Sequence, residues 1–290
     1  MPVTVSRHEL PTDTVGNASS LLEVLGGGLT QSLSRVESSP RTLARALATA
    51  ETVAQVHCLL DPTASKIETW EAFITAMQTS SAIFAAANST EGSIQCRIDH
   101  NMRTIPATGP QYYTDAGTWI TAFWLSVICR ESSRLDMLSA IPLDLLRSSG
   151  AIFDDYIYPW VDTLQTSWRE RSVPLDKLLE ALNETDPETL RVAPRELILK
   201  ILSPPLEMFL YYVREDSERF NASLVQALEL HKQYWTADEE RATDPTGLVA
   251  IGPLAVACLA HDAGVIPIEV ESDYLPKHLL LRSWLGEFDT

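Results

Sequence analysis

The sequence predicts an all-α protein: an irregular multi-helix array of antiparallel helix pairs, with one small β-hairpin near residues 93–106. Three observations lead to this fold class. Apolar residues recur at three- and four-residue steps along most of the chain, which is typical of helices that bury one face. Prolines stand where these periodic segments begin, a position at which the missing N–H removes no helical hydrogen bond. Only one stretch alternates in the manner of a hairpin.

The helical stripes are clearest in four segments. They are formed by Leu43, Leu47, Ala50 and Ala54, by Ile67, Trp70, Ile74 and Met77, by Ile157, Trp160, Leu164 and Trp168, and by Phe220, Leu224, Leu228 and His231. Together with weaker stripes they predict helices at 19–36, 40–60, 65–88, 115–132, 142–149, 155–171, 174–184, 194–213, 216–236, 246–263 and 276–284. The short connections favour antiparallel packing of successive helices.

Several helix starts carry capping signals. An aspartate can accept hydrogen bonds from the free N–H groups of a first turn, and a proline fits just after it. This arrangement occurs at Asp61-Pro62, Asp186-Pro187 and Asp244-Pro245. Ser65 and Glu68 have the spacing of a capping box. By contrast, Pro204-Pro205 should kink or break the helix predicted at 194–213, because neither residue can donate a backbone hydrogen bond.

The β-like stretch has a simple pattern. Ile94, Cys96 and Ile98 alternate, residues 99–101 can turn, and residues 102–105 can return. A further short strand is predicted at 266–270. Residues 1–18 lack periodicity and are predicted to form an extended N-terminal lead-in, while 19–290 form a single helical domain.

The charge balance limits the function classes. The chain has 22 Lys and Arg against 39 Asp and Glu, a formal net charge of −17. Such a charge disfavours sequence-independent binding to nucleic acid and docking on anionic membranes. Residues 1–20 show no secretory pattern, and the apolar runs 119–129 and 248–260 are shorter than the roughly 20 residues of a membrane span. Four separated cysteines without a C-x-x-C pair are expected to be reduced thiols, so we expect a cytoplasmic protein.

One segment is rich in acids beside aromatic residues. Asp154 and Asp155 stand at a predicted helix start, and Asp162 follows two turns later on the same face. Paired carboxylates on a helix can hold Mg²⁺. The two aspartates can equally serve as caps that favour the helix dipole.

In an all-α chain, this acidic start resembles the aspartate-rich motif of class I terpene synthases. That family also carries an N-x-x-x-S/T-x-x-x-E motif, whose nearest counterpart here runs from Asn221 to Glu229. Val225 replaces the hydroxyl ligand, and Tyr158 stands where the first motif has its third acid. A helical Mg-dependent enzyme acting on a phosphorylated small molecule is therefore an alternative with two departures from its pattern.

Other catalytic signatures are missing from the sequence. It contains no H-E-x-x-H, no G-x-S-x-G, and no phosphate-binding or dinucleotide-binding glycine motif. We therefore predict a protein that is not an enzyme and has no catalytic residues, no bound metal and no cofactor. A non-catalytic regulatory or scaffold protein stays open as a further alternative.

Blocks along nearly the whole chain carry a resemblance to a known family. They are Lys66–Phe73, Ile105–Tyr112, Thr118–Trp124, Tyr158–Asp162, Tyr234–Asp238 and Glu269–Lys277. The chain resembles the immunity-49 family of bacterial polymorphic toxin systems, and actinobacterial members in particular. The resemblance implies an all-α cytoplasmic protein that binds and neutralises a cognate toxin, often encoded beside it. The family has no catalytic residues to carry over.

The acidic charge suggests how such a partner would be bound. Toxins of these systems include nucleases, whose substrate grooves are basic, and complementary charge accelerates association. We expect an acidic, aromatic-rimmed surface that binds a basic toxin surface. The sequence leaves the oligomeric state of the protein open. The candidate binding residues are Asp154, Asp155, Tyr158 and Asp162, with Asp238, Glu239, Glu240 and Asp244 as a second group.

Overall fold

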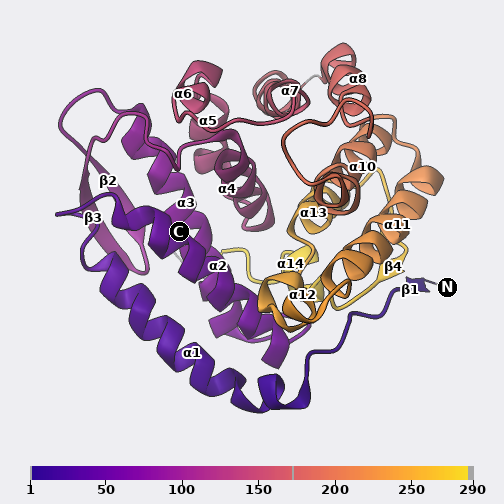
Figure 1. Cartoon of the computed structure of the whole chain (residues 1–290), viewed down its shortest axis with the longest axis horizontal. Helices are drawn as coiled ribbons and strands as arrows, with labels where there is room; N and C mark the ends of the chain where they lie inside the picture. Colours follow the sequence, from indigo (N-terminus) through magenta and orange to yellow (C-terminus); the bar gives the residue numbers. More distant parts are fainter. Residues whose placement is uncertain (1, 172, 287–290) are drawn as a thin grey trace.

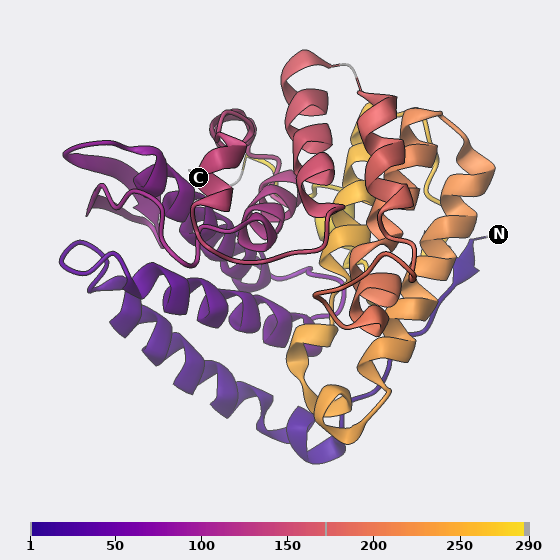
Figure 2. The same ribbon diagram turned by 45° about the horizontal axis from the view of Figure 1, so that its top comes forward.

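The computed structural model describes residues 2–171 and 173–286. Residues 1, 172 and 287–290, which the predicted lead-in and helical domain include, lie outside these ranges. Helices dominate the described chain, so the all-α prediction is confirmed. Figures 1 and 2 show the N-terminal helices on one side and the C-terminal helices on the other.

The N-terminal side is a set of successive helices. α1 (Thr12–Leu33), α2 (Thr42–Leu60) and α3 (Ile67–Asn88) follow one another, and α2 packs against both of its neighbours. The hairpin of β2 (Ser93–Ile98) and β3 (Asn101–Pro106) lies at the predicted place, at the end of the molecule away from the N-terminus (Figure 2). Its strands are antiparallel, with Ser93 opposite Pro106 and Ile98 opposite Asn101.

The central helix α4 (Ala116–Ile128) joins the two sides, since it packs against α3 and against α13 (Ile251–Ala263). The remaining helical elements are α5 (Ser132–Ser139), α6 (Leu143–Arg147), α7 (Ile157–Glu170), α8 (Leu175–Asn183), α9 (Arg195–Leu197), the π-helical turn η1 (Ile198–Leu202), α10 (Pro204–Val213), α11 (Ser217–Trp235), α12 (Glu239–Thr243), the 3-10 turn η2 (Pro245–Gly247) and α14 (Lys277–Leu280).

The core contains a run of aromatic rings that crosses from α4 to α10. Trp119 stacks on Phe123, with ring centroids 5.1 Å apart. Trp124 lies 6.0 Å from Trp160 of α7, and Trp160 lies 5.4 Å from Phe209 of α10. Aromatic pairs at such distances add to the stabilisation that burial alone provides. This run fixes the positions of α4, α7 and α10 relative to one another.

Within residues 2–171 and 173–286, one segment passes the length and composition test for a membrane span. Residues 245–263 are apolar enough, but 61% of that stretch is buried inside the structure. Leu254 to Cys258 are completely buried in α13. The burial accounts for the apolar composition, because α13 is a core helix packed on α4 and α10.

The N-terminus differs from the prediction. Residues 12–18, predicted as extended, form the first turns of α1, with Pro11 just before the helix and Asp13 in its first turn. The periodicity is weak there because most of these residues are exposed. Residues 3–4 are extended, as β1 (Val3–Thr4), and pair in parallel with β4 (Val270–Glu271). The strand predicted at 266–270 therefore overlaps the observed strand β4 only at Val270.

Two predicted helix starts are also corrected. No helix follows Asp186-Pro187; the Asp186 carboxylate accepts from the Glu188 N–H at 2.9 Å within a turn. The capping box from Ser65 does not form. Instead, buried Asp61 accepts from the backbone N–H groups of Ser65 and Lys66, at 3.0 and 2.8 Å, and from the hydroxyls of Ser65 and Thr69. The carboxylate that accepts N–H groups at the start of α3 thus belongs to a residue five positions before the N-cap residue, Lys66.

Two predicted helices are interrupted. The segment 115–132 ends at α4, and α5 begins at Ser132 after Arg130 adopts a φ of +58°. The break at Pro204-Pro205 is confirmed. There the chain widens into the π turn η1, in which the Ser203 N–H donates to the Ile198 carbonyl at 2.8 Å. The widened turn allows the chain to continue into α10, where the two prolines occupy positions that need no N–H.

Candidate functional site

Asp154 is buried and has a structural role. It lies just before α7 and is only 6% exposed. One carboxylate oxygen accepts from the Val192 N–H at 2.9 Å and from the Arg191 N–H, and the other accepts from the Ala193 N–H at 2.9 Å. Burial raises the pKa of this carboxyl, but the three backbone N–H donors outweigh it and hold the pKa below its usual value. Asp154 therefore ties the loop before α9 to the loop before α7, and its oxygens are occupied.

The rest of the first acidic group is nearer the surface. Asp155 is exposed and makes no ion pair within the described part of the chain. The Arg147 guanidinium lies 4.2 Å from the ring centroid of half-buried Tyr158. Asp162 forms an ion pair with Lys177 of α8. Of the three acids in this group, only Asp155 has a carboxylate without a cation or a donor beside it.

The second acidic group lies around α12. Asp238 caps this helix by accepting from the Arg241 N–H at 2.8 Å, and it pairs with the Arg241 guanidinium at 2.7 Å. Arg241 also pairs with Glu196 at 3.1 Å. Glu239 and Glu240 are exposed in the first turn, where negative charge favours the helix dipole. These two glutamates therefore present their charge to solvent.

Asp244 ends this group with another cap. Its carboxylate accepts from the Thr246 N–H at 2.9 Å and from the Thr246 hydroxyl at 2.7 Å, at the start of η2. This confirms the sequence expectation for Asp244-Pro245. Like Asp154, Asp244 is a residue whose main contacts are within its own chain.

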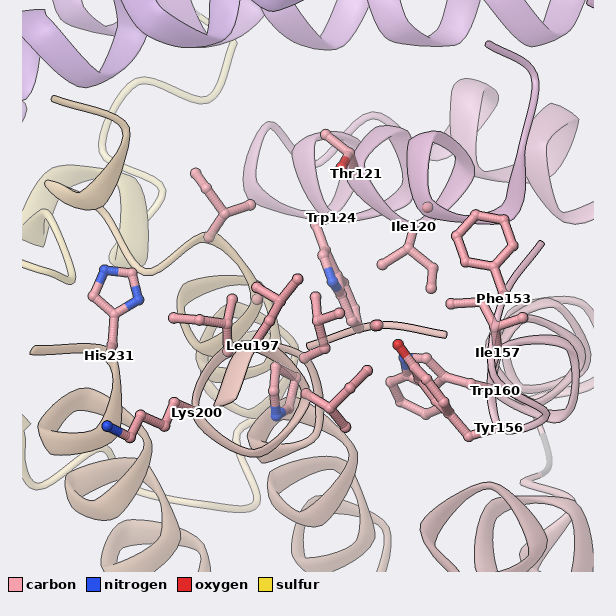
Figure 3. A pocket seen from close by; sticks show the side chains of 18 of the residues that line it. Ile120, Thr121, Trp124, Phe153, Tyr156, Ile157, Trp160, Leu197, Lys200 and His231 are labelled. Atoms are coloured by element: carbon pink, nitrogen blue, oxygen red, sulfur yellow. The ribbon is translucent and has the colours of Figure 1, made fainter. Parts of the chain in front are cut away.

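Asp154 and Thr246 both line a largely apolar cavity of about 420 Å³ (Figure 3). Phe153, next to Asp154, and His231 of α11 also line it. Of the eight predicted binding residues, Asp154 alone lines this cavity, and the second acidic group is connected to it only through Thr246, the residue that Asp244 caps. Figure 3 shows Phe153 and His231 on opposite sides of it.

Several helical elements supply the cavity walls. Ile120 and Trp124 come from α4, Ile157 and Trp160 from α7, and Leu197 and Lys200 from α9 and η1, with further residues from α11 and α13. The π turn matters here because its extra residue per turn changes the direction of the side chains that follow α9. Lys200 pairs with Glu196 at 2.8 Å, so its charge is balanced.

His231 is the titratable residue buried at one end of the cavity. Its Nε2 lies 2.8 Å from the Gly247 carbonyl. Burial lowers its pKa to about 4, although the hydrogen bond to the Gly247 carbonyl acts in the opposite direction and raises it. The ring is therefore neutral at pH 7 and holds η2 in place.

The sequence reasoning missed the cavity and its rim. The only signal was the concentration of aromatic residues between 112 and 168, which includes Trp124, Tyr156 and Trp160. The role of Asp154 was also missed, because its partners lie 37 to 39 residues later in the chain.

The structure does not assemble the alternative metal site. Among the described residues, no three His, Cys, Asp or Glu side chains gather in a group that could hold a metal ion. The Asn221 amide instead accepts from the Glu269 N–H and donates to the Pro267 carbonyl, at 2.8 and 2.9 Å. Cys58, Cys129 and Cys258 are buried, and burial raises the pKa of each thiol. Buried, protonated thiols are poor nucleophiles.

Comparison with known proteins gives the family. A family model described as Immunity protein 49 matches residues 61–279. That segment contains both acidic groups and every residue that lines the apolar cavity. A search of curated proteins and a search of solved structures gave no significant match. Because the family match covers well over half of the 290 residues, this chain belongs to the immunity protein 49 family.

Proposed function

We propose that this protein binds and neutralises a cognate protein toxin in the cytoplasm, using exposed acids to attract a basic surface of that toxin. The family match is the observation that carries the proposal, since it gives the chain an immunity role in general and favours binding over catalysis. The net charge of −17 supports the electrostatic part, because it disfavours nucleic acid and favours a basic protein.

The acids are not equivalent in this proposal. Asp154, Asp238 and Asp244 accept backbone N–H groups, so each stabilises its own chain. Asp162 is paired with Lys177. Among the candidate residues, the acids whose charge is available to a partner are therefore Asp155, Glu239 and Glu240. Asp155 represents the first group in the proposed surface, and the two glutamates represent the second.

Attraction of a basic toxin has a defined physical consequence. Complementary charge raises association rates from about 10⁵–10⁶ M⁻¹s⁻¹ toward 10⁸–10⁹ M⁻¹s⁻¹ at low salt. A nuclease is the toxin class that suits this surface best, because acids can occupy the sites of substrate phosphates in its basic groove. Rapid capture is useful for a protein that must intercept a toxin before it acts.

Co-expression with a candidate cognate toxin, sought first among the neighbouring genes, tests the proposal. The unmodified chain should restore growth, and the double variant Glu239→Lys/Glu240→Lys should protect less. Glu23→Lys/Glu91→Lys is the matched control, because it changes the net charge equally at exposed positions outside both acidic groups. If the unmodified chain gives no protection, the immunity proposal fails. If both double variants protect equally, the electrostatic surface is wrong.

A further inference from the structure

The apolar cavity reaches the surface through an opening with an apolar rim. Ile152, Val192 and Leu202 line the cavity and are 78%, 48% and 37% exposed. They come from three different segments: the loop before α7, the loop before α9, and the π turn η1. Exposed apolar side chains that surround one opening are typical of a binding site, whereas single ones are ordinary on any surface.

The interior is built to surround an apolar group. Figure 3 shows Trp124, Tyr156 and Trp160 converging on the cavity, with Ile120 and Ile157 beside them. Among the described residues, the indole N–H of Trp235, which also lines the cavity, is buried without an acceptor. Donors in such surroundings normally find an acceptor. A segment that entered the cavity could supply one with a backbone carbonyl.

The rim is held in place before any partner arrives. The Asp154 carboxylate joins the loop that carries Ile152 to the loop that carries Val192, through the backbone N–H groups of residues 191–193. Val192 itself donates one of these bonds, at 2.9 Å. A site whose loops are already ordered loses less entropy when it binds.

We propose that this cavity is the anchor site for the toxin: it receives one large apolar side chain from a toxin loop whose flanking residues are Lys or Arg. This inference rests on the proposed function and identifies the place at which the toxin is bound. The charge argues for a basic flank, because exposed Asp155 stands three residues from Ile152 on the same loop. The α12 acids are near the cavity wall as well, since Arg241 of α12 pairs with Glu196, the residue before the lining residue Leu197. Buried aromatic and apolar anchors supply most of the binding energy in protein interfaces.

Ile152→Asp separates the anchor from simple charge attraction. If charge alone governs binding, an added acid should tighten the complex with a basic toxin. If the rim is an apolar anchor site, the same change should raise Kd at least about tenfold, as expected when a hot-spot contact is removed. Val24→Asp is the matched control, since Val24 is 73% exposed on α1, does not line the cavity and lies outside the family match. It should change Kd less than twofold.

Ala193→Trp provides a second test from inside the cavity. Ala193 lines the cavity, and an indole there would occupy the space that the toxin side chain needs. Kd would be measured by calorimetry with the purified toxin, and the thermal midpoint of each variant would verify folding. The exposed Ile152 variant keeps the test valid if Ala193→Trp does not fold.

The outcomes distinguish the two proposals. If the unmodified chain does not bind the toxin, the proposed function fails and the anchor site fails with it. If the unmodified chain binds, but Ile152→Asp leaves Kd unchanged or lowers it, the anchor site alone is wrong. A weaker Ile152→Asp complex with an unaffected Val24→Asp complex supports the anchor site.

Discussion

Replacing Asp154 by asparagine should loosen the two loops that form the cavity rim. In the native chain, one carboxylate oxygen accepts hydrogen bonds from the N–H groups of Arg191 and Val192, and the other accepts one from the N–H of Ala193. Asparagine is close in shape but offers a single carbonyl oxygen, and its NH₂ group would face the third N–H donor. The variant therefore loses one charge-assisted bond and weakens two others.

The size of this effect follows from those three bonds. Hydrogen bonds to a charged group contribute about 1.5–3 kcal/mol each, against about 1 kcal/mol for neutral ones. One lost bond and two weakened bonds give a cost of roughly 3 kcal/mol. An unfolding entropy of about 2.1 cal/mol/K per residue converts this into a fall of about 5 °C in the thermal midpoint of a chain this long.

Hydrogen exchange and thermal unfolding together test this expectation. If the loops open locally, the amides of residues 191–193 should exchange about 100-fold faster at neutral pH. The control is Asp155→Asn, one residue later, exposed and without these bonds, which should change neither measurement appreciably. Equal behaviour of the two variants would refute the structural role of Asp154.

The same bonds give a pH dependence with a definite sign. The pKa of Asp154 is lowered in the folded chain, so its contribution is fully present above the ordinary carboxyl pKa and disappears as the pH falls through the lower folded value. The difference in stability between the native chain and Asp154→Asn should therefore be largest near neutral pH and shrink in acid. A difference that grows in acid would contradict this.

Two further predictions concern stability, and urea unfolding can measure both. Gly247→Ala should lower the free energy of unfolding by about 1–3 kcal/mol, because its Cβ would lie 2.5 Å from the Trp235 ring. The control Gly27→Ala, in open space on α1, should raise it by up to about 1 kcal/mol. An unchanged stability of Gly247→Ala would show that the ring moves freely. His231 should reduce the free energy of unfolding as the pH falls from about 6.5 toward 4, by at most about 1.4 kcal/mol per pH unit, because the unfolded chain takes up a proton that the buried ring does not. His231→Gln should flatten that slope, and an unchanged slope would show that other groups cause it.

Much of the helical architecture was predictable because its signals are local. The stripe of Phe220, Leu224 and Leu228 repeats within one helix, and residue pairs such as Asp244-Pro245 mark a turn a few residues away. These patterns report which face is buried and where an N–H lacks a partner. They do not depend on which helix lies opposite.

The candidate site was less predictable because its contacts are distant in sequence. Asp154 looked like a helix cap or a surface acid, but its partners come from a loop that arrives only after α8. The same reason hides the cavity: Trp124, Trp160 and Leu197 belong to three segments whose approach is set by tertiary packing. The early start of α1 was missed for a different reason, since its first turns bury little apolar surface.

The salt dependence of binding tests the central claim most directly. Calorimetric titration of the purified chain with its purified cognate toxin would be repeated at about 50 and 300 mM salt, a range over which screening of exposed charges increases strongly. The account predicts saturable binding that weakens as salt rises, with a smaller salt effect for Glu239→Lys/Glu240→Lys than for Glu23→Lys/Glu91→Lys. Absence of binding, or an affinity unaffected by salt and by the position of the reversed charges, would contradict it.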